Sequence, residues 1–177
     1  MKNRVNKLLN TKRILIYGDP GSGKNYLAEK LSRKLHIAFY DLDDVIWKEK
    51  FTIKRPKSVR KKMVETLAKK KSWIMGGTGS SWSSPAVLRS QFIIILRESF
   101  FVETWRILRR WLKRKFSANP PKEGFKDIID LVKFDYDNFH KAGSKQPIYF
   151  EQLKKKYKNK LMQLSSKKEV QQFLEGG

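Results

Sequence analysis

The chain has 177 residues, 40% of them hydrophobic and 12% aromatic, which suits one domain with a packed core. It has no cysteine, which excludes disulfides and cysteine-bound metals, and its two histidines lie far apart, which argues against a histidine zinc site. Forty Lys and Arg residues against 17 Asp and Glu give a formal net charge of +23, which favours anionic partners such as nucleotides, nucleic acid or acidic membranes. A lysine-rich surface without such a partner is the alternative.

Strand and helix patterns alternate along the first part of the chain. The apolar run 13–17 predicts a strand, and Leu27, Leu31 and Leu35 recur at the spacing of a helix after the Gly-rich segment that follows it. Further short strands are predicted at 37–40, 72–75 and 92–96, with a helix at 57–70. The run FIIIL at 92–96 is apolar throughout, which favours a buried central strand.

The second part of the chain is mainly helical. A long helix opens at Ser99 and carries an apolar stripe, Phe101, Trp105, Leu108 and Leu112, beside a basic one, Arg106, Arg109, Arg110 and Lys113. Two prolines and a glycine in KFSANPPKEG, 115–124, predict a loop after this helix. Helices are expected again at 125–140 and 148–157, a strand at 160–164, and a last helix capped by Ser166 and Glu169.

This alternation predicts a three-layer α/β fold, with a parallel sheet covered by helices on both faces. The carboxyl ends of parallel strands meet at one edge of the sheet, where ligands bind. Four predicted strands run into polar or Gly-rich segments, namely GDPGSGK, DLDD, GGTGSS and RES. We therefore expect these four segments to converge on one site.

The octet GDPGSGKN at 18–25 follows a predicted strand and opens a helix, which is the context of a phosphate-binding P-loop. Its glycines allow phosphate oxygens to approach backbone N–H groups, and its lysine adds a mobile positive charge. A glycine-rich turn with an accidental lysine is the alternative. The residues expected to bind nucleotide are Gly18, Asp19, Pro20, Gly21, Ser22, Gly23, Lys24 and Asn25, together with Arg106 further along the chain.

Asn25 stands where such loops usually carry Ser or Thr as a magnesium ligand. Its carbonyl oxygen can also coordinate a hard cation, directly or through water, and capping the helix is the alternative role. Asp41, Asp43 and Asp44 follow the second predicted strand, where carboxylates can hold hydrated Mg²⁺ or accept a proton. A helix cap or a solvated acidic turn is the alternative. We expect Asn25 and Asp41 to bind the metal and Asp43 to act in catalysis.

The expected acceptor site comprises Asp43, Trp47, Gly77, Thr78 and Arg97. Trp47 can stack on a substrate ring or fill the core. The Gly-rich segment around Gly77 and Thr78 can pass close to a ligand or form an ordinary loop. Arg97 can meet a phosphate or pair with an aspartate.

Arg106 and Arg110 lie four residues apart on one helix face. Arginines placed there suit phosphoryl transfer, because they neutralise charge on the moving group. The alternative is a solvated basic face. The expected catalytic set is Lys24, Asp43, Arg106 and Arg110.

Together these motifs resemble the small P-loop kinases of the adenylate kinase and shikimate kinase type, and among them most closely the adenylate-kinase-related DNA topology modulation proteins. The resemblance runs from residue 12 to residue 174 and rests on the P-loop, LDDVIW (42–47), SWIMGG (72–77), FIIIL (92–96) and WRILRR (105–110). The chain departs from that family's pattern at Asn25, at Gly76–Thr78, where the family commonly has DGN, and at Arg97, where an Asp is usual.

The resemblance implies a P-loop NTPase fold with a five-stranded parallel sheet, ATP as phosphate donor, and Mg²⁺. It also implies one kinase domain over 1–177, with a small arginine-bearing lid at 106–124 and an acceptor-binding segment at 41–71. The turn around Ser165–Lys168 would meet the adenine.

These observations favour a phosphotransferase that moves the γ-phosphate of ATP to a small acceptor, a nucleotide or nucleoside-like molecule. Asn25 leaves open a P-loop protein that binds ATP with little or no turnover. The charge leaves open a nucleotide-dependent nucleic-acid binder, which is not favoured because no nucleic-acid module is recognisable. The N-terminus lacks a signal-peptide core and no apolar run is long enough to cross a membrane, so we expect a cytoplasmic monomer or homodimer that is not inserted in a membrane.

Overall fold

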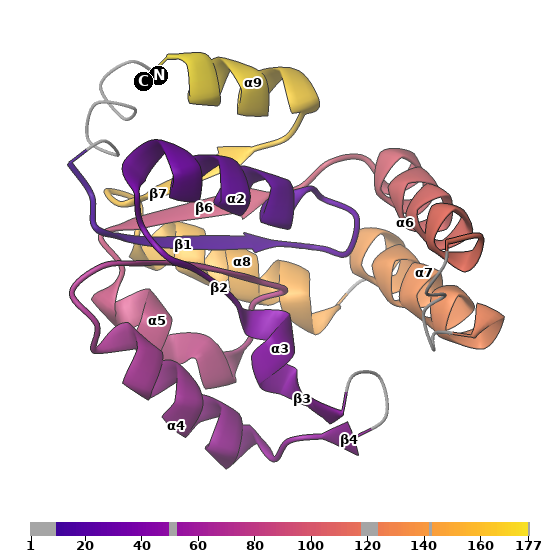
Figure 1. Cartoon of the computed structure of the whole chain (residues 1–177), viewed down its shortest axis with the longest axis horizontal. Helices are drawn as coiled ribbons and strands as arrows, with labels where there is room; N and C mark the ends of the chain where they lie inside the picture. Colours follow the sequence, from indigo (N-terminus) through magenta and orange to yellow (C-terminus); the bar gives the residue numbers. More distant parts are fainter. Residues whose placement is uncertain (1–9, 50–52, 118–123, 142, 177) are drawn as a thin grey trace.

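The computed structural model of the chain describes residues 10–49, 53–117, 124–141 and 143–176. At its centre lies a five-stranded parallel sheet with the strand order β2-β5-β1-β6-β7 (Figure 1). The five strands are β1 (Arg13–Gly18), β2 (Phe39–Asp41), β5 (Trp73–Gly77), β6 (Phe92–Leu96) and β7 (Leu161–Leu164). All five were expected from the sequence, within one or two residues at each end, and the parallel sheet is confirmed.

Helices cover both faces of this sheet, which gives the three layers that the sequence predicts (Figure 1). One face packs against α2 (Lys24–Leu35) and α9 (Lys167–Glu175), and its core includes Ile14, Leu27 and Phe173. The opposite face packs against α4 (Lys57–Ala68), α5 (Ser84–Arg89) and α8 (Lys145–Lys156), and its core includes Leu15, Val64 and Phe150. Adjacent residues of β1 thus point to opposite cores, as the alternation of a strand requires.

Two further helices, α6 (Phe100–Lys115) and α7 (Phe125–His140), pack on each other beyond the edge where β1 runs into α2 (Figure 1). We call this pair the arm. The buried residues of the arm are Glu103 and Ile107 of α6 and Ile128, Asp135 and Asn138 of α7.

Short elements between the strands were not predicted. Helix α3 (Leu42–Ile46) follows β2, and β3 (Trp47–Glu49) pairs with β4 (Ile53–Lys54) as an antiparallel hairpin. A single 3₁₀ turn, η1 (Ser81–Ser83), precedes α5. These elements are too short to show a helical or strand period in the sequence, which explains why they were missed.

The ends of three helices refine the predictions. Helix α8 begins three residues before the expected 148, and α4 ends two residues before the expected 70. The sequence predicts a capping box at the start of α9, in which Ser166 and Glu169 each accept a hydrogen bond from the other's backbone N–H. The structure forms one of these two bonds, from Glu169 N to Ser166 Oγ at 3.1 Å. Glu169 Oε2 accepts instead from Ser165 N, at 2.8 Å. Both contacts still satisfy N–H groups at the start of α9.

The expected lid and acceptor segment fall on identifiable elements, although their roles stay predictions. Residues 106–115 of the lid belong to α6, while 118–123 lie outside the described residues. The acceptor segment 41–71 comprises α3, the β3–β4 hairpin and α4, and its residues 50–52 lie outside the described residues. Within the described part of the chain, every helix is too short or too polar to cross a bilayer.

Candidate phosphate-binding site

The P-loop joins the central strand β1 to α2 at the carboxyl edge of the sheet. Gly21 and Gly23 have φ angles of +84° and +91°, in the left-handed region that favours glycine. Gly23 is also the N-cap of α2, and no side chain caps the helix there. The first N–H groups of α2 therefore face a Gly-lined turn, which is the geometry of an anion-binding nest at a helix N-terminus.

The glycines also allow the loop to pack closely on its surroundings. A Cβ on Gly18 would lie 2.8 Å from the carbonyl oxygen of Leu96 in β6. A Cβ on Gly21 would lie 2.9 Å from Cα of Glu103 in α6, and closer still to that residue's carbonyl oxygen. The loop is thus wedged between the tip of the sheet and the first turn of the arm.

Lys24 and Asp43, two of the expected catalytic residues, lie side by side. Nζ of Lys24 is 3.7 Å from Oδ2 of Asp43, and the lysine side chain is 10% exposed. Lys24 is the first residue of α2 and Asp43 belongs to α3, so the tips of β1 and β2 bring them together. Because this lysine sits at the mouth of the anion nest, Asp43 balances a charge that phosphate oxygens would otherwise meet.

Asn25 and Asp41, the two expected metal ligands, form a direct hydrogen bond. Nδ2 of Asn25 donates to Oδ2 of Asp41 at 2.8 Å, while Asp41 Oδ1 accepts from the backbone N–H of Asp43 and so caps α3. Asp41 thus caps α3, which was the alternative role for the acidic segment, and it also contacts Asn25. Asn25 itself does not cap α2, because the N-cap of that helix is Gly23.

Two buried oxygens beside this contact have no hydrogen-bond partner within the described residues, namely Asn25 Oδ1 and Asp43 Oδ1. Burial, together with the nearby charge of Asp43, raises the pKa of Asp41. Neutral and charged oxygens that lack partners and lie next to an anion nest are the donor set that a hard cation such as Mg²⁺ takes. The residues present at this position therefore fit Mg²⁺.

Arg106 contacts the P-loop. Its Nη1 donates to the carbonyl oxygens of Gly21 and Ser22 at 3.2 and 3.3 Å, and its Nη2 pairs with Oε1 of Glu98 at 2.9 Å. Glu98 is 9% exposed and was missed in the sequence analysis, although it lies in the RES segment after β6. Arg110 lies one turn further along α6 and is exposed. The described contacts thus make Arg106 a clamp on the backbone of the loop.

The remaining acceptor-site candidates lie on different elements. Arg97 donates to the carbonyl oxygen of Asn138 at 3.2 Å, so it contacts α7. Trp47 is half-buried in β3, with Nζ of Lys54 5.0 Å from its ring centroid. A Cβ on Gly77 would lie 2.7 Å from Cβ of Leu42, so close packing of α3 on β5 requires that glycine.

Thr78 follows Gly77 directly, and its carbonyl oxygen accepts a hydrogen bond from Nε2 of Gln146 in α8. The structure therefore brings Asp43 close to the P-loop. It places the other acceptor candidates on surrounding elements, where their role stays a prediction.

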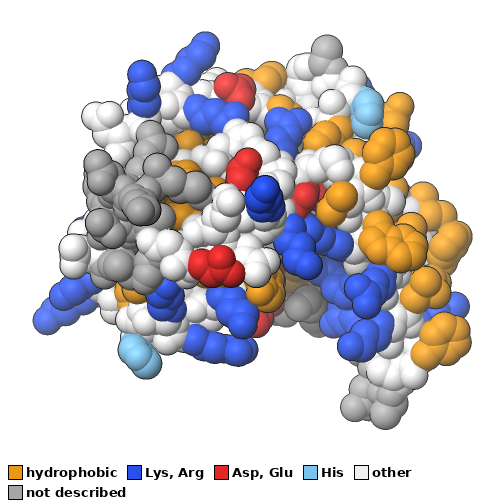
Figure 2. Space-filling model, turned by 90° about the horizontal axis from the view of Figure 1, so that it is seen from above, with side chains coloured by type: hydrophobic (Ala, Val, Ile, Leu, Met, Phe, Trp, Pro, Cys, Tyr) orange, Lys and Arg blue, Asp and Glu red, His pale blue; other side chains and the backbone are white. Residues whose placement is uncertain are grey.

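Most of the apolar stripe of α6 faces solvent, while its Leu108 is half-buried. Phe101 is 82% exposed and Trp105 is 64% exposed, whereas Glu103 and Ile107 are buried. Figure 2 shows hydrophobic side chains gathered along the edge of the molecule that the arm forms. The periodicity thus predicted the helix correctly, and it made no prediction of the face that packs on the protein.

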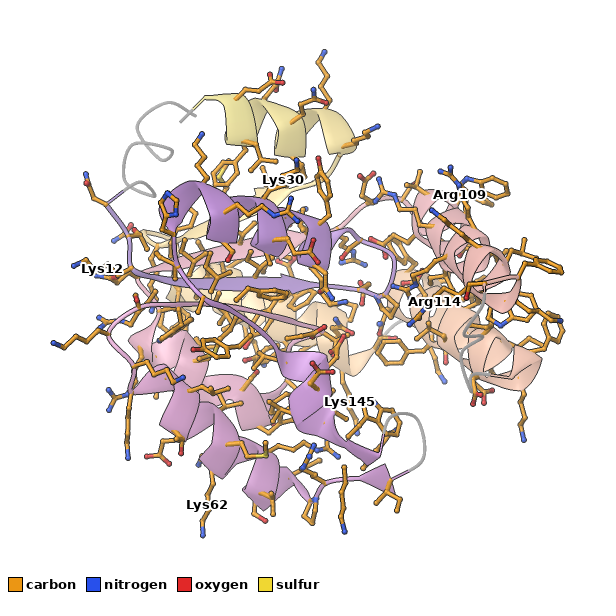
Figure 3. All side chains as sticks on the ribbon, in the orientation of Figure 1. Lys12, Lys30, Lys62, Arg109, Arg114 and Lys145 are labelled. Atoms are coloured by element: carbon orange, nitrogen blue, oxygen red, sulfur yellow. The ribbon has the colours of Figure 1, made fainter. Side chains whose placement is uncertain are left out.

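Basic side chains are spread over the surface. Figure 3 labels Lys12 just before β1, Lys30 on α2, Lys62 on α4, and Arg109 and Arg114 on α6. The labelled positive charges therefore come from separate elements around the fold.

Comparison with known proteins shows the fold and leaves the family open. No protein-family model matches the chain. The uncharacterized protein YqaC of Bacillus subtilis (strain 168) is 34% identical over 86 residues, which are 48% of this chain and 47% of that protein. The chain thus matches about half the length of this curated relative.

Two solved structures resemble the chain over most of its length. A shikimate kinase from Bacteroides thetaiotaomicron has a TM-score of 0.56 at 14% identity, over 93% of this chain and 95% of that one. A gluconokinase from Sinorhizobium meliloti 1021 has a TM-score of 0.57 at 14% identity, over 93% and 90%. The chain therefore has the P-loop fold of these small-molecule kinases. The narrower resemblance to the DNA topology modulation family is not confirmed.

Proposed function

We propose that the protein is an ATP-dependent phosphotransferase that moves the γ-phosphoryl group to a small acceptor, with a nucleotide or nucleoside-like molecule as the favoured class. The observation that carries the proposal is the pair of Lys24 and Asp43, 3.7 Å apart, at the Gly-lined and uncapped start of α2. A cation for phosphate and a carboxylate for an acceptor hydroxyl are adjacent there. The kinases that share this fold make the same reaction class a reasonable expectation, on fold-level analogy alone.

Each residue has a role that follows from its position. Backbone N–H groups of Gly21–Lys24 and the Lys24 ammonium would hold the terminal phosphates of ATP. Asn25, through its unpartnered Oδ1, and Asp41, whose two oxygens each accept one hydrogen bond, would hold Mg²⁺, which when bound neutralises phosphate charge. Once phosphate engages Lys24, its contact with Asp43 is released and the carboxylate is free to orient the acceptor hydroxyl and accept its proton.

The arm supplies positive charge to the same place. In this proposal Arg106 and Arg110 neutralise the transferring phosphoryl group. The nearest atom to a Cβ built on Gly23 is Nη1 of Arg106, at 3.8 Å, so the guanidinium borders the anion nest. Trp47, Thr78 and the other acceptor candidates would line the far side of the site.

A phosphotransfer screen tests the proposal. The full chain is incubated with ATP and each of a panel of nucleoside monophosphates, nucleosides and small hydroxyl metabolites, with and without Mg²⁺, and phosphorylated product is followed by mass spectrometry. We expect product from one acceptor class, lost in Lys24→Ala and kept in Lys30→Ala, an exposed lysine of the same helix. Intact ATP binding with no product from any class would refute phosphotransfer.

A second candidate function is ATP binding without turnover. The hydrogen bond between Asn25 and Asp41 favours it, because the amide of Asn25 occupies a carboxylate oxygen that Mg²⁺ would otherwise bind. Asn25→Ser and Asn25→Thr restore the hydroxyl found in other P-loops. If either variant gains phosphotransfer that the wild type lacks, the second function is correct. Mg²⁺-dependent turnover by the wild type would exclude it.

A further inference from the structure

Three carboxylates from three separate elements meet where the arm touches the P-loop. They are Asp19 of the P-loop, Glu103 of α6 and Asp135 of α7, with one oxygen of each within 4.8 Å of the others. Their exposed fractions are 1%, 0% and 0%. In Figure 1 the two helices of the arm lie directly beyond the loop that follows β1. We call this group the carboxylate triad.

The positive charges around the triad do not balance it. Arg97 is close enough for its charge to act on Asp19 and Asp135, and it donates its described hydrogen bond to the carbonyl oxygen of Asn138. Lys24 is paired with Asp43. Among ion pairs between described residues, no Lys or Arg is paired with a member of the triad. Three buried acids thus share, at most, the charge of one neighbouring guanidinium and part of that of Lys24.

When its carboxyls are ionised, the triad also contains oxygens without a partner among the described residues. Both carboxylate oxygens of Asp135 and Oε2 of Glu103 are buried and receive no hydrogen bond from an N–H or hydroxyl group, and a proton held by Glu103 or Asp135 would link these two carboxyls to each other. By contrast, Oε1 of Glu103 accepts from the N–H of Glu98 at 2.9 Å, and Oδ1 of Asp19 accepts from Nδ2 of Asn138 at 3.0 Å. A fully buried aspartate with two free oxygens is costly unless a ligand or a proton meets it.

We propose that Asp19, Glu103 and Asp135 form a binding site for a hard divalent cation, Ca²⁺ or Mg²⁺, which ties the P-loop to both helices of the arm. This site uses none of the residues assigned to the nucleotide-bound metal and does not depend on phosphotransfer. Calcium binds oxygens at about 2.3–2.6 Å, so two oxygens on one ion stand up to about 5 Å apart. Three oxygens within 4.8 Å of one another lie within a few tenths of an ångström of the spacing that one Ca²⁺ spans, and Mg²⁺, which binds at about 2.0–2.1 Å, draws them closer together.

Protons compete with the cation for the same oxygens. In the empty triad, burial and then the charge of Asp135 raise the pKa of Glu103 to about 9, and burial and then the charge of Asp19 raise that of Asp135 to about 7. The positive charges of Arg97 and Lys24 act in the opposite direction on Asp135. Because a cation needs the ionised carboxylates, its binding releases protons and strengthens as pH rises.

Cation titrations of the nucleotide-free full chain test the site. After removal of metal with EDTA and desalting, thermal unfolding and isothermal titration calorimetry are measured with CaCl₂ and with MgCl₂. At a concentration 100 times the dissociation constant, we expect the melting temperature to rise by about 5–10 °C. Between pH 6 and 8 the affinity should rise by up to about tenfold per pH unit for each proton displaced.

Matched variants assign the response to the triad. Asp135→Asn should lose at least about tenfold in affinity, because it removes one of three carboxylate ligands. Asp130→Asn changes an exposed aspartate of the same helix and should respond as the wild type does. Asp41→Asn should also keep the response, which separates the triad from the candidate nucleotide metal. If Asp135→Asn does not fold, Glu103→Gln takes its place.

The proposal is overturned if the wild type and Asp135→Asn respond equally to both salts, or if neither responds. It is also overturned if Asp41→Asn abolishes the response, since the cation would then bind beside Asn25. A stability that depends on pH alone, with no effect of either cation, would show that protons occupy the triad. No nucleotide enters these measurements, so their outcome is separate from that of the phosphotransfer screen.

Discussion

Replacing Gly21 with alanine measures how tightly the P-loop is held against the arm. At φ +84° a residue with a Cβ pays a left-handed backbone penalty of about 1–2 kcal/mol. The added Cβ would also lie 2.9 Å from Cα of Glu103 and nearer still to its carbonyl oxygen, which is backbone and cannot rotate away. Overpacking of this kind costs about 1–3 kcal/mol. We therefore expect Gly21→Ala to lower the free energy of unfolding by about 2–5 kcal/mol.

Gly143 provides the matched control. Its φ is +82°, and a Cβ built there meets no atom within 4 Å. Gly143→Ala thus carries the backbone penalty alone, about 1–2 kcal/mol. The difference between the two variants, about 1–3 kcal/mol, isolates the contact between Gly21 and α6.

Urea unfolding followed by tryptophan fluorescence gives the three free energies, and thermal melts check them at about 2–4 °C per kcal/mol for a chain of this size. Equal losses in Gly21→Ala and Gly143→Ala would refute the reasoning, because the arm would then be able to move off the loop at little cost. Unchanged denaturant slopes are needed for the comparison to hold.

Two further predictions concern the same region. Arg106→Ala should lower the free energy of unfolding by about 1–3 kcal/mol, because it leaves the buried carboxylate of Glu98 without its partner. Replacing the exposed Arg109 with alanine should change that free energy by less than about 0.5 kcal/mol. Equal effects of the two variants in urea unfolding would contradict the role of Arg106 as a clamp on the P-loop. Without metal, in EDTA, the pKa of Glu103 is about 9 in the folded chain and about 4.5 in the unfolded chain. The folded state therefore binds one more proton between these pH values, so the free energy of unfolding should fall as pH rises from about 4.5 to 9. Glu103→Gln should flatten that slope by up to about 1.4 kcal/mol per pH unit, and an unchanged pH profile of the melting temperature would count against the raised pKa.

The sheet was predictable because its strands carry strong local signals. The run FIIIL forms β6 at the expected bounds, and α7 spans the expected 125–140. The P-loop was equally clear, because glycine spacing between a strand and a helix is a local pattern with a known physical cause. The convergence of the segments that carry Lys24 and Asp43 was predictable, since the carboxyl ends of parallel strands meet at one edge even though β5 lies between β1 and β2.

The arm was not predictable in the same way. The apolar stripe did not indicate which face of α6 packs on the protein, and the structure exposes Phe101 and Trp105 while it buries Glu103. Which face a helix buries depends on what the rest of the chain places beside it, and a helical period carries no such information. The meeting of Glu103 with Asp19 and Asp135 also joins residues far apart in the sequence, and a single carboxylate on a helix has no pattern that marks it.

The central position of β1 sets the order of events while the chain is being made. Strand β1 is synthesised early, but its two neighbours in the sheet are β5, residues 73–77, and β6, residues 92–96. The glycine turn after β1 is then wedged against Glu103, which is made later still. Strand β1 therefore cannot complete both of its pairings until residues 92–96 have been made, and non-local pairing of this kind is slow to form. The part of the molecule with the most recognisable local pattern thus depends on segments made after it for its final packing.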